Sequence, residues 1–303
     1  MRTVAALLAA LAAAATLAAC GGGAEPGASK EATLVLDFTP TAVHAGIYAA
    51  LREGAYQDAG VDLHVQAPSS STDAPKLLAA GRAQFAILDI HDLAIARHRG
   101  LPLFGVAPIV DRPLASVIAR DPREVRTPAD LAGKTVGVTG LPSDDAVLDS
   151  ILRAGGLPPS AVHRVTIGFG AVPALAAGRI DAATSFWNDE GVTLRRRGVP
   201  VRIFRVDDFG APSFPELVLT TTRSVLAHQP ALVHAVVRAT QRGYAVARSD
   251  PARALDALVA TNPTIDRVEA RAQLRALNAA NAFTPHLPRR RLNALVARGY
   301  AGP

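Results

Sequence analysis

Four short stretches of this sequence carry polar or aromatic side chains that could do chemistry. They are "DF" at 37–38, "DIH" at 89–91, "GLPS" at 140–143 and "WNDE" at 187–190, and each follows a short apolar run. A carboxylate can act as an acid or base, and carboxylates beside aromatic rings can also hold a flat, nitrogen-rich ring. These residue types therefore leave catalysis and ligand binding open.

The apolar runs alternate with helical patterns along the chain. Strands are expected at 32–38, 61–66, 84–89, 101–110, 114–120, within 127–140, and at 161–168, 179–187, 201–210 and 216–222. Helices are expected at 42–56, 72–81, 91–100, 142–156 and 171–178, and over most of the chain after 222. This alternation predicts βαβ units and a parallel-rich sheet.

The α/β pattern runs twice and then ends in helices, which predicts two lobes. We expect lobe 1 to comprise 33–113 and 214–303, and lobe 2 to comprise 114–213, with a hinge where the chain crosses. Ligands of open α/β sheets bind beyond the carboxyl ends of strands. The four polar stretches should therefore face a cleft between the lobes.

The N-terminus predicts export and lipid anchoring. Residues 1–19 read as a signal peptide whose apolar core is too short for a comfortable membrane span. "LAAC" ends at Cys20, the sole cysteine, and a Gly/Ser/Pro-rich tether follows over 20–32. This resembles the lipobox of bacterial lipoproteins, in which the cysteine is lipidated; an ordinary signal peptide with a chance cysteine is the alternative. The expected location is the extracytoplasmic face of the cell membrane.

Charge and motifs exclude several classes of function. The net charge is +6, but the "RRR" runs at 195–197 and 289–291 are short and no basic block contains interleaved aromatic residues. We therefore expect no nucleic-acid partner. No zinc-ligand spacing, Walker loop or G-x-S-x-G elbow appears. The sequence predicts neither a metal nor a cofactor.

Several longer stretches resemble a known family in order and spacing. They include "LVLDFTPTAVHAGIYAALREGAYQDAGVDLHV", "DLAGKTVGVTGLPSDDAVLDSIL" and "AAGRIDAATSFWNDEGV", and the similarity covers roughly 33–260. They resemble extracellular solute-binding proteins of the thiamine-pyrimidine-precursor family. The resemblance implies a periplasmic-binding-protein-like α/β fold with two lobes, a hinge and an interlobe ligand cleft. It also implies a protein that delivers a flat N-heterocycle to an ABC permease and its ATPase. We expect the protein to be a monomer.

Other ligands and an enzyme remain alternatives. Riboflavin is one alternative ligand. Alkylsulfonate or nitrate anions are another, but a protein that binds them should have basic residues after the strand ends, where this chain has carboxylates. The family also includes a fungal hydroxymethylpyrimidine phosphate synthase. The synthase's reacting histidine corresponds to His91 in this chain. The position of its pyridoxal-phosphate lysine is occupied by Ile87, and the position of its cysteine-rich iron-binding run by "VDDFGAPSFPEL", which has no cysteine. Without that lysine the cofactor has no covalent anchor, so we expect a binding protein rather than a secreted synthase.

Five residues are expected to contact the heterocycle most directly. Phe38 and Trp187 could stack on it from opposite lobes; the alternatives are core and interlobe packing. Asp37 and Glu190 could accept hydrogen bonds from an exocyclic amine and a ring nitrogen; the alternatives are a helix cap and a solvated loop charge. Asn188 could donate and accept at the ring edge, or could be a turn residue. Relatives often carry Trp at the Phe38 position, which makes ring size there a candidate determinant of ligand preference.

The remaining expected positions lie on the same cleft walls. His44 and Tyr48 are one helical turn apart and could both line the cleft, although a lone helix histidine can be structural. Asp89 and His91 flank a strand end, where capping the next helix is the alternative. The helix that begins near 142 offers free N–H groups, but two aspartates in that turn argue against a bound phosphate. The full expected set is Asp37, Phe38, Pro40, His44, Tyr48, Asp89, His91, Ser143 (chiefly as a cap), Trp187, Asn188 and Glu190.

Overall fold

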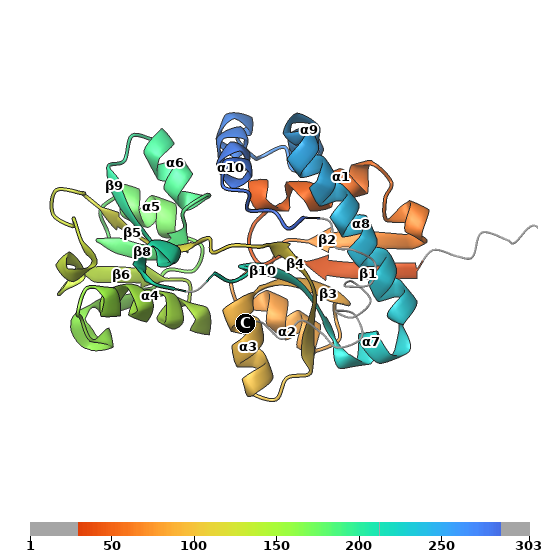
Figure 1. Cartoon of the computed structure of the whole chain (residues 1–303), viewed down its shortest axis with the longest axis horizontal. Helices are drawn as coiled ribbons and strands as arrows, with labels where there is room; N and C mark the ends of the chain where they lie inside the picture. Colours follow the sequence, from red (N-terminus) through yellow and green to blue (C-terminus); the bar gives the residue numbers. More distant parts are fainter. Residues whose placement is uncertain (1–29, 212, 286–303) are drawn as a thin grey trace, which may run out of the picture.

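The computed structural model describes residues 30–211 and 213–285. The expected signal peptide, the expected lipidation site Cys20, most of the expected tether and the last residues of the expected lobe 1 lie outside this part. Two α/β lobes lie side by side, each built on one five-stranded sheet (Figure 1). None of the helices in the described part is long and apolar enough to cross a membrane.

The first lobe contains the sheet with strand order β2-β1-β3-β10-β4. Its strands are β1 (Lys30–Val35), β2 (Val61–Gln66), β3 (Phe85–Asp89), β4 (Leu103–Val110) and β10 (Leu217–Thr222). The second lobe contains the order β7-β6-β8-β5-β9. Its strands are β5 (Ala115–Arg120), β6 (Thr135–Val138), β7 (His163–Thr166), β8 (Ala182–Phe186) and β9 (Val201–Arg205).

Both sheets are mixed, so the expected parallel-rich sheet is only half right. In the first lobe β1 runs parallel to β2 and β3, whereas β10 runs antiparallel to β3 and β4. In the second lobe β6 runs parallel to β7 and β8, whereas β5 runs antiparallel to β8 and β9. The antiparallel strands β5 and β10 are the two that bring the chain across between lobes. Each enters its sheet where neighbouring strands end, as the pairing of Leu217 with Asp89 shows.

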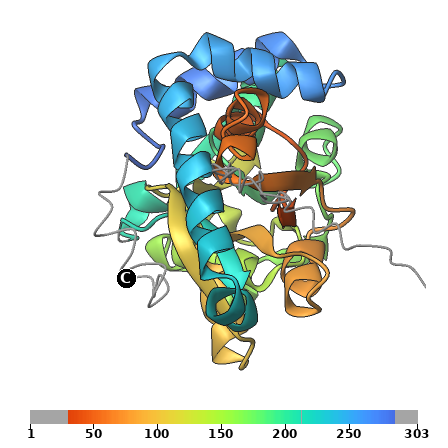
Figure 2. The ribbon, with the colours of Figure 1, turned by 90° about the vertical axis from the view of Figure 1, so that its right-hand side faces the viewer.

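Helices cover both sheets and complete the first lobe. They are α1 (Ala45–Arg52), α2 (Asp73–Ala79), α3 (Ile90–His98), α4 (Pro142–Ala154), α5 (Ala171–Ala176), α6 (Glu190–Arg196), α7 (Arg223–His228), α8 (Pro230–Ser249), α9 (Pro251–Thr261) and α10 (Arg267–Ala279). The C-terminal helices α8 and α9 pack over α1 (Figure 2). The α1–α8 crossing is close because Gly243 has no side chain; a Cβ there would lie 1.9 Å from the carbonyl oxygen of Gly46.

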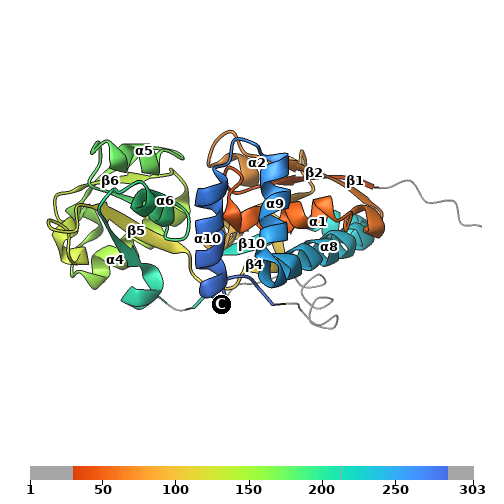
Figure 3. The ribbon, with the colours of Figure 1, turned by 90° about the horizontal axis from the view of Figure 1, so that it is seen from above.

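Two sequence signals set the C-terminal helices, as expected. Helix α8 begins at Pro230, and α9 begins at Pro251 with the Asp250 carboxylate accepting a hydrogen bond from the backbone N–H of Arg253 at 3.1 Å. The last helix, α10, lies against α6 of the second lobe (Figure 3). The C-terminal segment therefore both completes the first lobe and touches the second.

Candidate functional site

A cavity of about 110 Å³ lies where the two lobes meet. It is lined by residues that follow β1 and β3 in the first lobe, and by residues that follow β6 and β8 in the second. Strand ends from both lobes therefore form one site. Six of the expected residues line it: Asp37, Phe38, Asp89, Ser143, Asn188 and Glu190.

Five expected residues are not in the cavity lining. Tyr48 and His44 are buried behind it, and Pro40 lies in the turn between them and β1. His91 points instead against Phe214, with the ring centroids 4.6 Å apart. These positions support the cavity rather than line it.

Trp187 is packed at the crossing between the lobes. Its indole Nε1 donates to the carbonyl oxygen of Pro113 at 3.1 Å, and the guanidinium carbon of Arg205 lies 4.4 Å from the ring centroid. Only 9% of the residue is exposed. This geometry corresponds to the interlobe-packing alternative, because the ring fastens the first chain crossing to the end of β8.

Asp37 is held in place by His44. The backbone N–H of Thr41 donates to Nδ1 of His44 at 3.1 Å, so the imidazole proton lies on Nε2, which contacts Asp37 Oδ1 at 2.9 Å. The histidine orients the carboxylate from behind. Asp37 itself lines the cavity.

Ser143 does not cap α4, contrary to expectation. The helix begins with Leu141 as N-cap and Pro142 at the first helical position, which leaves Ser143 inside the first turn. The Asp144 carboxylate accepts from the backbone N–H of Leu141 at 3.1 Å instead. It also accepts from Thr139 Oγ1 at 2.7 Å, so the acid that was expected to repel a phosphate organises this turn.

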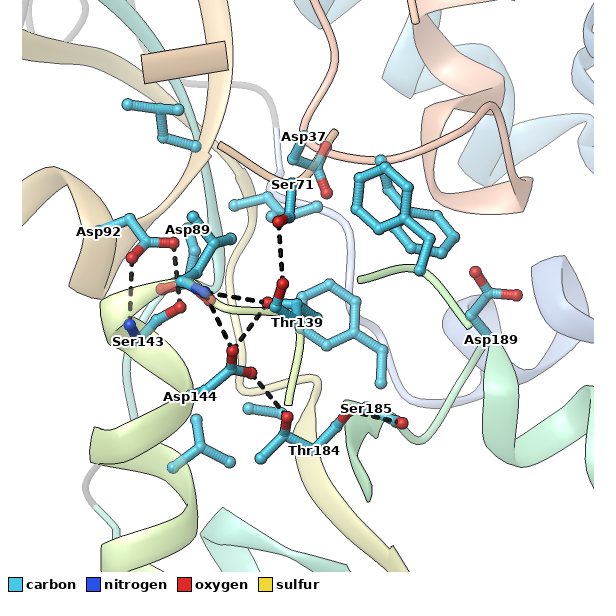
Figure 4. A pocket seen from close by; sticks show the side chains of 18 of the residues that line it. Asp37, Ser71, Asp89, Asp92, Thr139, Ser143, Asp144, Thr184, Ser185 and Asp189 are labelled. Atoms are coloured by element: carbon cyan, nitrogen blue, oxygen red, sulfur yellow. Dashed lines mark hydrogen bonds between the residues drawn. The ribbon is translucent and has the colours of Figure 1, made fainter. Parts of the chain in front are cut away.

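The sequence analysis did not predict several residues that line the cavity, although some of them follow a strand as the predicted residues do. Phe169 follows β7 as Phe38 follows β1, and the two rings meet edge to face with centroids 4.5 Å apart. Asp189 lies inside the "WNDE" stretch and lines the cavity from the second lobe (Figure 4). Ser71 and Asp92 had no local signal; Ser71 Oγ donates to the carbonyl oxygen of Thr139 at 2.9 Å across the lobes.

Burial weakens the acidity of several cavity carboxyl groups. It raises the pKa of Glu190 to about 7, and burial with the nearby Asp89 charge raises that of Asp92 to about 7. Burial, followed by the charges of Glu190, Glu269 and Asp37, raises the pKa of Asp189 well above its ordinary value. The cavity therefore accepts negative charge poorly.

Asn188 lies at the cavity wall and has a buried hydrogen-bond acceptor without a partner among the described residues. The residue is 1% exposed and lines the cavity, and its side-chain Oδ1 is buried without a hydrogen-bond partner among the described residues. Buried amide oxygens are normally paired. A ligand that donates a hydrogen bond at this point would satisfy it.

One cluster beside the cavity could hold a metal ion. Among the described residues, Asp89, His91 and Glu216 place donor atoms within 4.8 Å of one another. Burial and the Asp89 charge raise the pKa of Glu216 well above its ordinary value. A proton shared between the two carboxyl groups would equally relieve their repulsion.

The lobes, the antiparallel crossing strands and the cavity between them define a periplasmic-binding-protein-like fold, as expected from the sequence. The alkanesulfonate-binding protein SsuA of Xanthomonas axonopodis pv. citri superposes with a TM-score of 0.69 at 15% identity, over 88% of this chain and 89% of that one. At this identity the likeness concerns the fold alone.

The chain belongs to the NMT1/THI5-like family, whose model matches residues 41–254. It is 30% identical over 271 residues to the formylaminopyrimidine-binding protein of Halalkalibacterium halodurans, covering 87% of this chain and 82% of that protein. It is also 26% identical to a 4-amino-5-hydroxymethyl-2-methylpyrimidine phosphate synthase of Legionella pneumophila, covering 77% of this chain and 74% of the relative. The family expected from the sequence is confirmed.

Proposed function

We propose that this protein is the extracytoplasmic solute-binding component of an ABC importer and binds a small, flat N-heterocycle between its lobes. The buried, unpartnered Oδ1 of Asn188 carries the proposal, because it calls for a ligand with hydrogen-bond donors. Carboxylates line the same cavity, and no Lys, Arg or His is among its lining residues in the described part of the chain. An aminopyrimidine has the required donors, and the relative from H. halodurans is named for binding such a ring.

The same lining argues against an anionic ligand. Sulfonate or nitrate would need cationic or N–H donors, whereas this cavity presents carboxylates with raised pKa values. The aromatic contact between Phe38 and Phe169 adds a flat apolar wall that suits a ring. A pyrimidine thiamine precursor fits these features better than a small inorganic anion.

The synthase chemistry of some relatives does not fit these residues. Ile87, at the position of the cofactor-binding lysine, is fully buried in the core of β3. The stretch 206–217 contains no cysteine, since the sole cysteine is Cys20. Pyridoxal phosphate would find neither an amine for a Schiff base nor the cysteine-rich run in this chain.

Ligand screening tests the proposal. Thermal-shift measurements with hydroxymethylpyrimidine, formylaminopyrimidine, thiamine, riboflavin, an alkanesulfonate and nitrate should give stabilisation by a pyrimidine, followed by calorimetry on the best ligand. Asn188→Leu should weaken that ligand about tenfold or more without unfolding the protein. Stabilisation by the anions alone would reject the heterocycle, and product formation in a turnover assay would reject the binding role.

A further inference from the structure

The cavity is lined by the same number of acidic groups from each lobe. Asp37, Asp89 and Asp92 come from the first lobe, and Asp144, Asp189 and Glu190 come from the second. No basic side chain is among the lining residues in the described ranges. Bringing the lobes together therefore gathers like charges in a poorly solvated space, which is unfavourable unless protons or a cation offset them.

Four of these six carboxylates pair with a side chain that can donate a hydrogen bond. Hydroxyl, imidazole or N–H groups bind four of them: His44 binds Asp37, His91 binds Asp89, Ser143 binds Asp92, and Thr139 binds Asp144. The neighbouring pair Asp189 and Glu190 accepts hydrogen bonds from amide N–H groups only. Asp189 accepts from the amide of Gln273 on α10, and Glu190 accepts from the backbone N–H of Phe186 at 3.0 Å.

Besides burial, the charges that raise the pKa of Asp189 come from three other carboxyl groups. They come from Glu190 on its own helix, from Glu269 on α10 and from Asp37 after β1. Glu269 is itself paired with Arg197 at 3.5 Å. Asp37 lies on the first-lobe wall and Asp189 on the second-lobe wall, so the two carboxyl groups approach the cavity from opposite lobes (Figure 4).

A second observation places a ligand at this end of the cavity. Asn188 directly precedes Asp189, is almost completely buried, and leaves its Oδ1 without a partner among the described residues. An acceptor oxygen beside two carboxyl groups, without a cation of the protein, matches a ligand that is both a donor and positively charged.

We propose that the ligand is bound as a cation, with a protonated or alkylated ring nitrogen between Asp37 of the first lobe and the Asp189–Glu190 pair of the second, and a donor group on Asn188. This inference rests on the proposed function and names the ligand's charge. The positive charge offsets the repulsion that closure creates, so a charged ring favours closure and a neutral or anionic ring of the same shape does not.

Three probes of similar shape and different charge test the inference on the full-length chain by calorimetry at pH 8. They are N1-methyl-4-aminopyrimidinium, neutral 4-aminopyrimidine and pyrimidine-4-carboxylate. The pyrimidinium should bind at least tenfold more tightly than the neutral ring, and the carboxylate should not bind. The affinity for the pyrimidinium should also fall as the pH is lowered through about 7, because protonated Glu190 no longer offers a charge.

Variants distinguish the effect of the carboxylate at the cavity from the effect of the protein's net charge on binding. Asp189→Asn should weaken the pyrimidinium at least tenfold and leave the neutral ring unchanged; Glu190→Gln provides the same test if the first variant does not fold. Asp145→Asn is the matched control, since Asp145 lies in the same lobe, is 69% exposed and is not in the cavity lining. Equal affinity for charged and neutral rings would overturn the charge inference and leave the binding function standing. Binding of none of the three probes or the heterocycles above would overturn both.

Discussion

Asp92 of α3 and Ser143 of α4 are joined by two hydrogen bonds that cross from one lobe to the other. The backbone N–H of Ser143 donates to Asp92 Oδ1 at 3.1 Å, and the hydroxyl donates to Oδ2 at 2.9 Å. Both residues are buried and line the cavity. The pair therefore forms only when the lobes are together, and it links their approach to the walls of the cavity.

Removing the Ser143 hydroxyl should weaken ligand binding through closure. A hydrogen bond to an uncharged group contributes about 0.5–1.5 kcal/mol, so Ser143→Ala should lower affinity by roughly 2- to 10-fold. The backbone bond to Asp92 remains, so the thermal unfolding of each lobe should change little. Calorimetry of the best ligand measures the effect. Ser160→Ala, an exposed serine of the same lobe, is the control; equal effects of the two variants would contradict this role of Ser143.

The same carboxyl group should make stability depend on pH. Its pKa is raised to about 7, chiefly by burial, so the folded protein holds a proton on Asp92 that the unfolded chain has lost. This contribution is fully present below about pH 4 and is lost as the pH rises through about 7. Asp92→Asn retains a neutral side chain at every pH.

We therefore expect Asp92→Asn to match the parent chain near pH 4.5 and to exceed it in Tm by several degrees at pH 8. Each kcal/mol of unfolding free energy corresponds to a change in Tm of about 2–4 °C for a protein of this size class. Thermal scans from pH 4.5 to 8 measure the gap. Asp62→Asn, whose side chain is 50% exposed, should show no such trend; a pH-independent gap for Asp92→Asn would refute the assignment.

The sequence predicted elements and strand ends well because both depend on local patterns. β2 and the start of α9 lie where the apolar alternation and the Asp250–Pro251 pair place them. Asp37 and Glu190 line the cavity because side chains that follow strands in such sheets converge at one edge. The direction of β5 and β10 was missed, since it depends on where the chain crosses between lobes rather than on any residue nearby.

The errors within the site came from partners distant in sequence. Trp187 has a side chain suited to stacking on a ligand, but its contacts with Pro113 and Arg205 set its position. No local sequence pattern reveals these contacts. Asp92 looked like an ordinary helical residue, and only its pairing with Ser143, 51 positions away, brings it into the site. Sequence reasoning therefore located the cavity wall but not the contacts that close it.

Glu216 supports the first chain crossing, and its protonation state can be tested by substitution. Its Oε2 accepts from the backbone N–H groups of Leu114 and Ala115 at 2.5 and 2.7 Å, and the residue is fully buried. Because burial raises its pKa well above the ordinary value, Glu216→Gln should keep the acceptor and cost little stability. Glu216→Ala leaves two buried donors unpaired and should cost about 2–5 kcal/mol, measured by urea unfolding. A glutamine variant as unstable as alanine would show that the charged carboxylate is required, with a bound cation as one cause.

Phe169 should contribute to ligand affinity as strongly as Phe38, although its position carries no family signal. The two rings come from opposite lobes and meet edge to face at 4.5 Å, so together they form an apolar wall of the cavity. Aromatic pairs contribute about 0.5–1.5 kcal/mol beyond the area that they bury. Phe169→Ala and Phe38→Ala should each weaken the best heterocycle by about tenfold, whereas Phe169→Leu, which keeps apolar volume without a ring, should lose less.

The double variant separates a shared wall from two independent contacts. If the rings act as one surface across the closed lobes, Phe38→Ala together with Phe169→Ala should weaken binding by clearly less than the product of the single effects. Calorimetry on the four proteins of the cycle gives the coupling. Fully multiplicative losses would show that each ring contacts the ligand independently, and unchanged affinity in Phe169→Ala would remove this ring from the binding site.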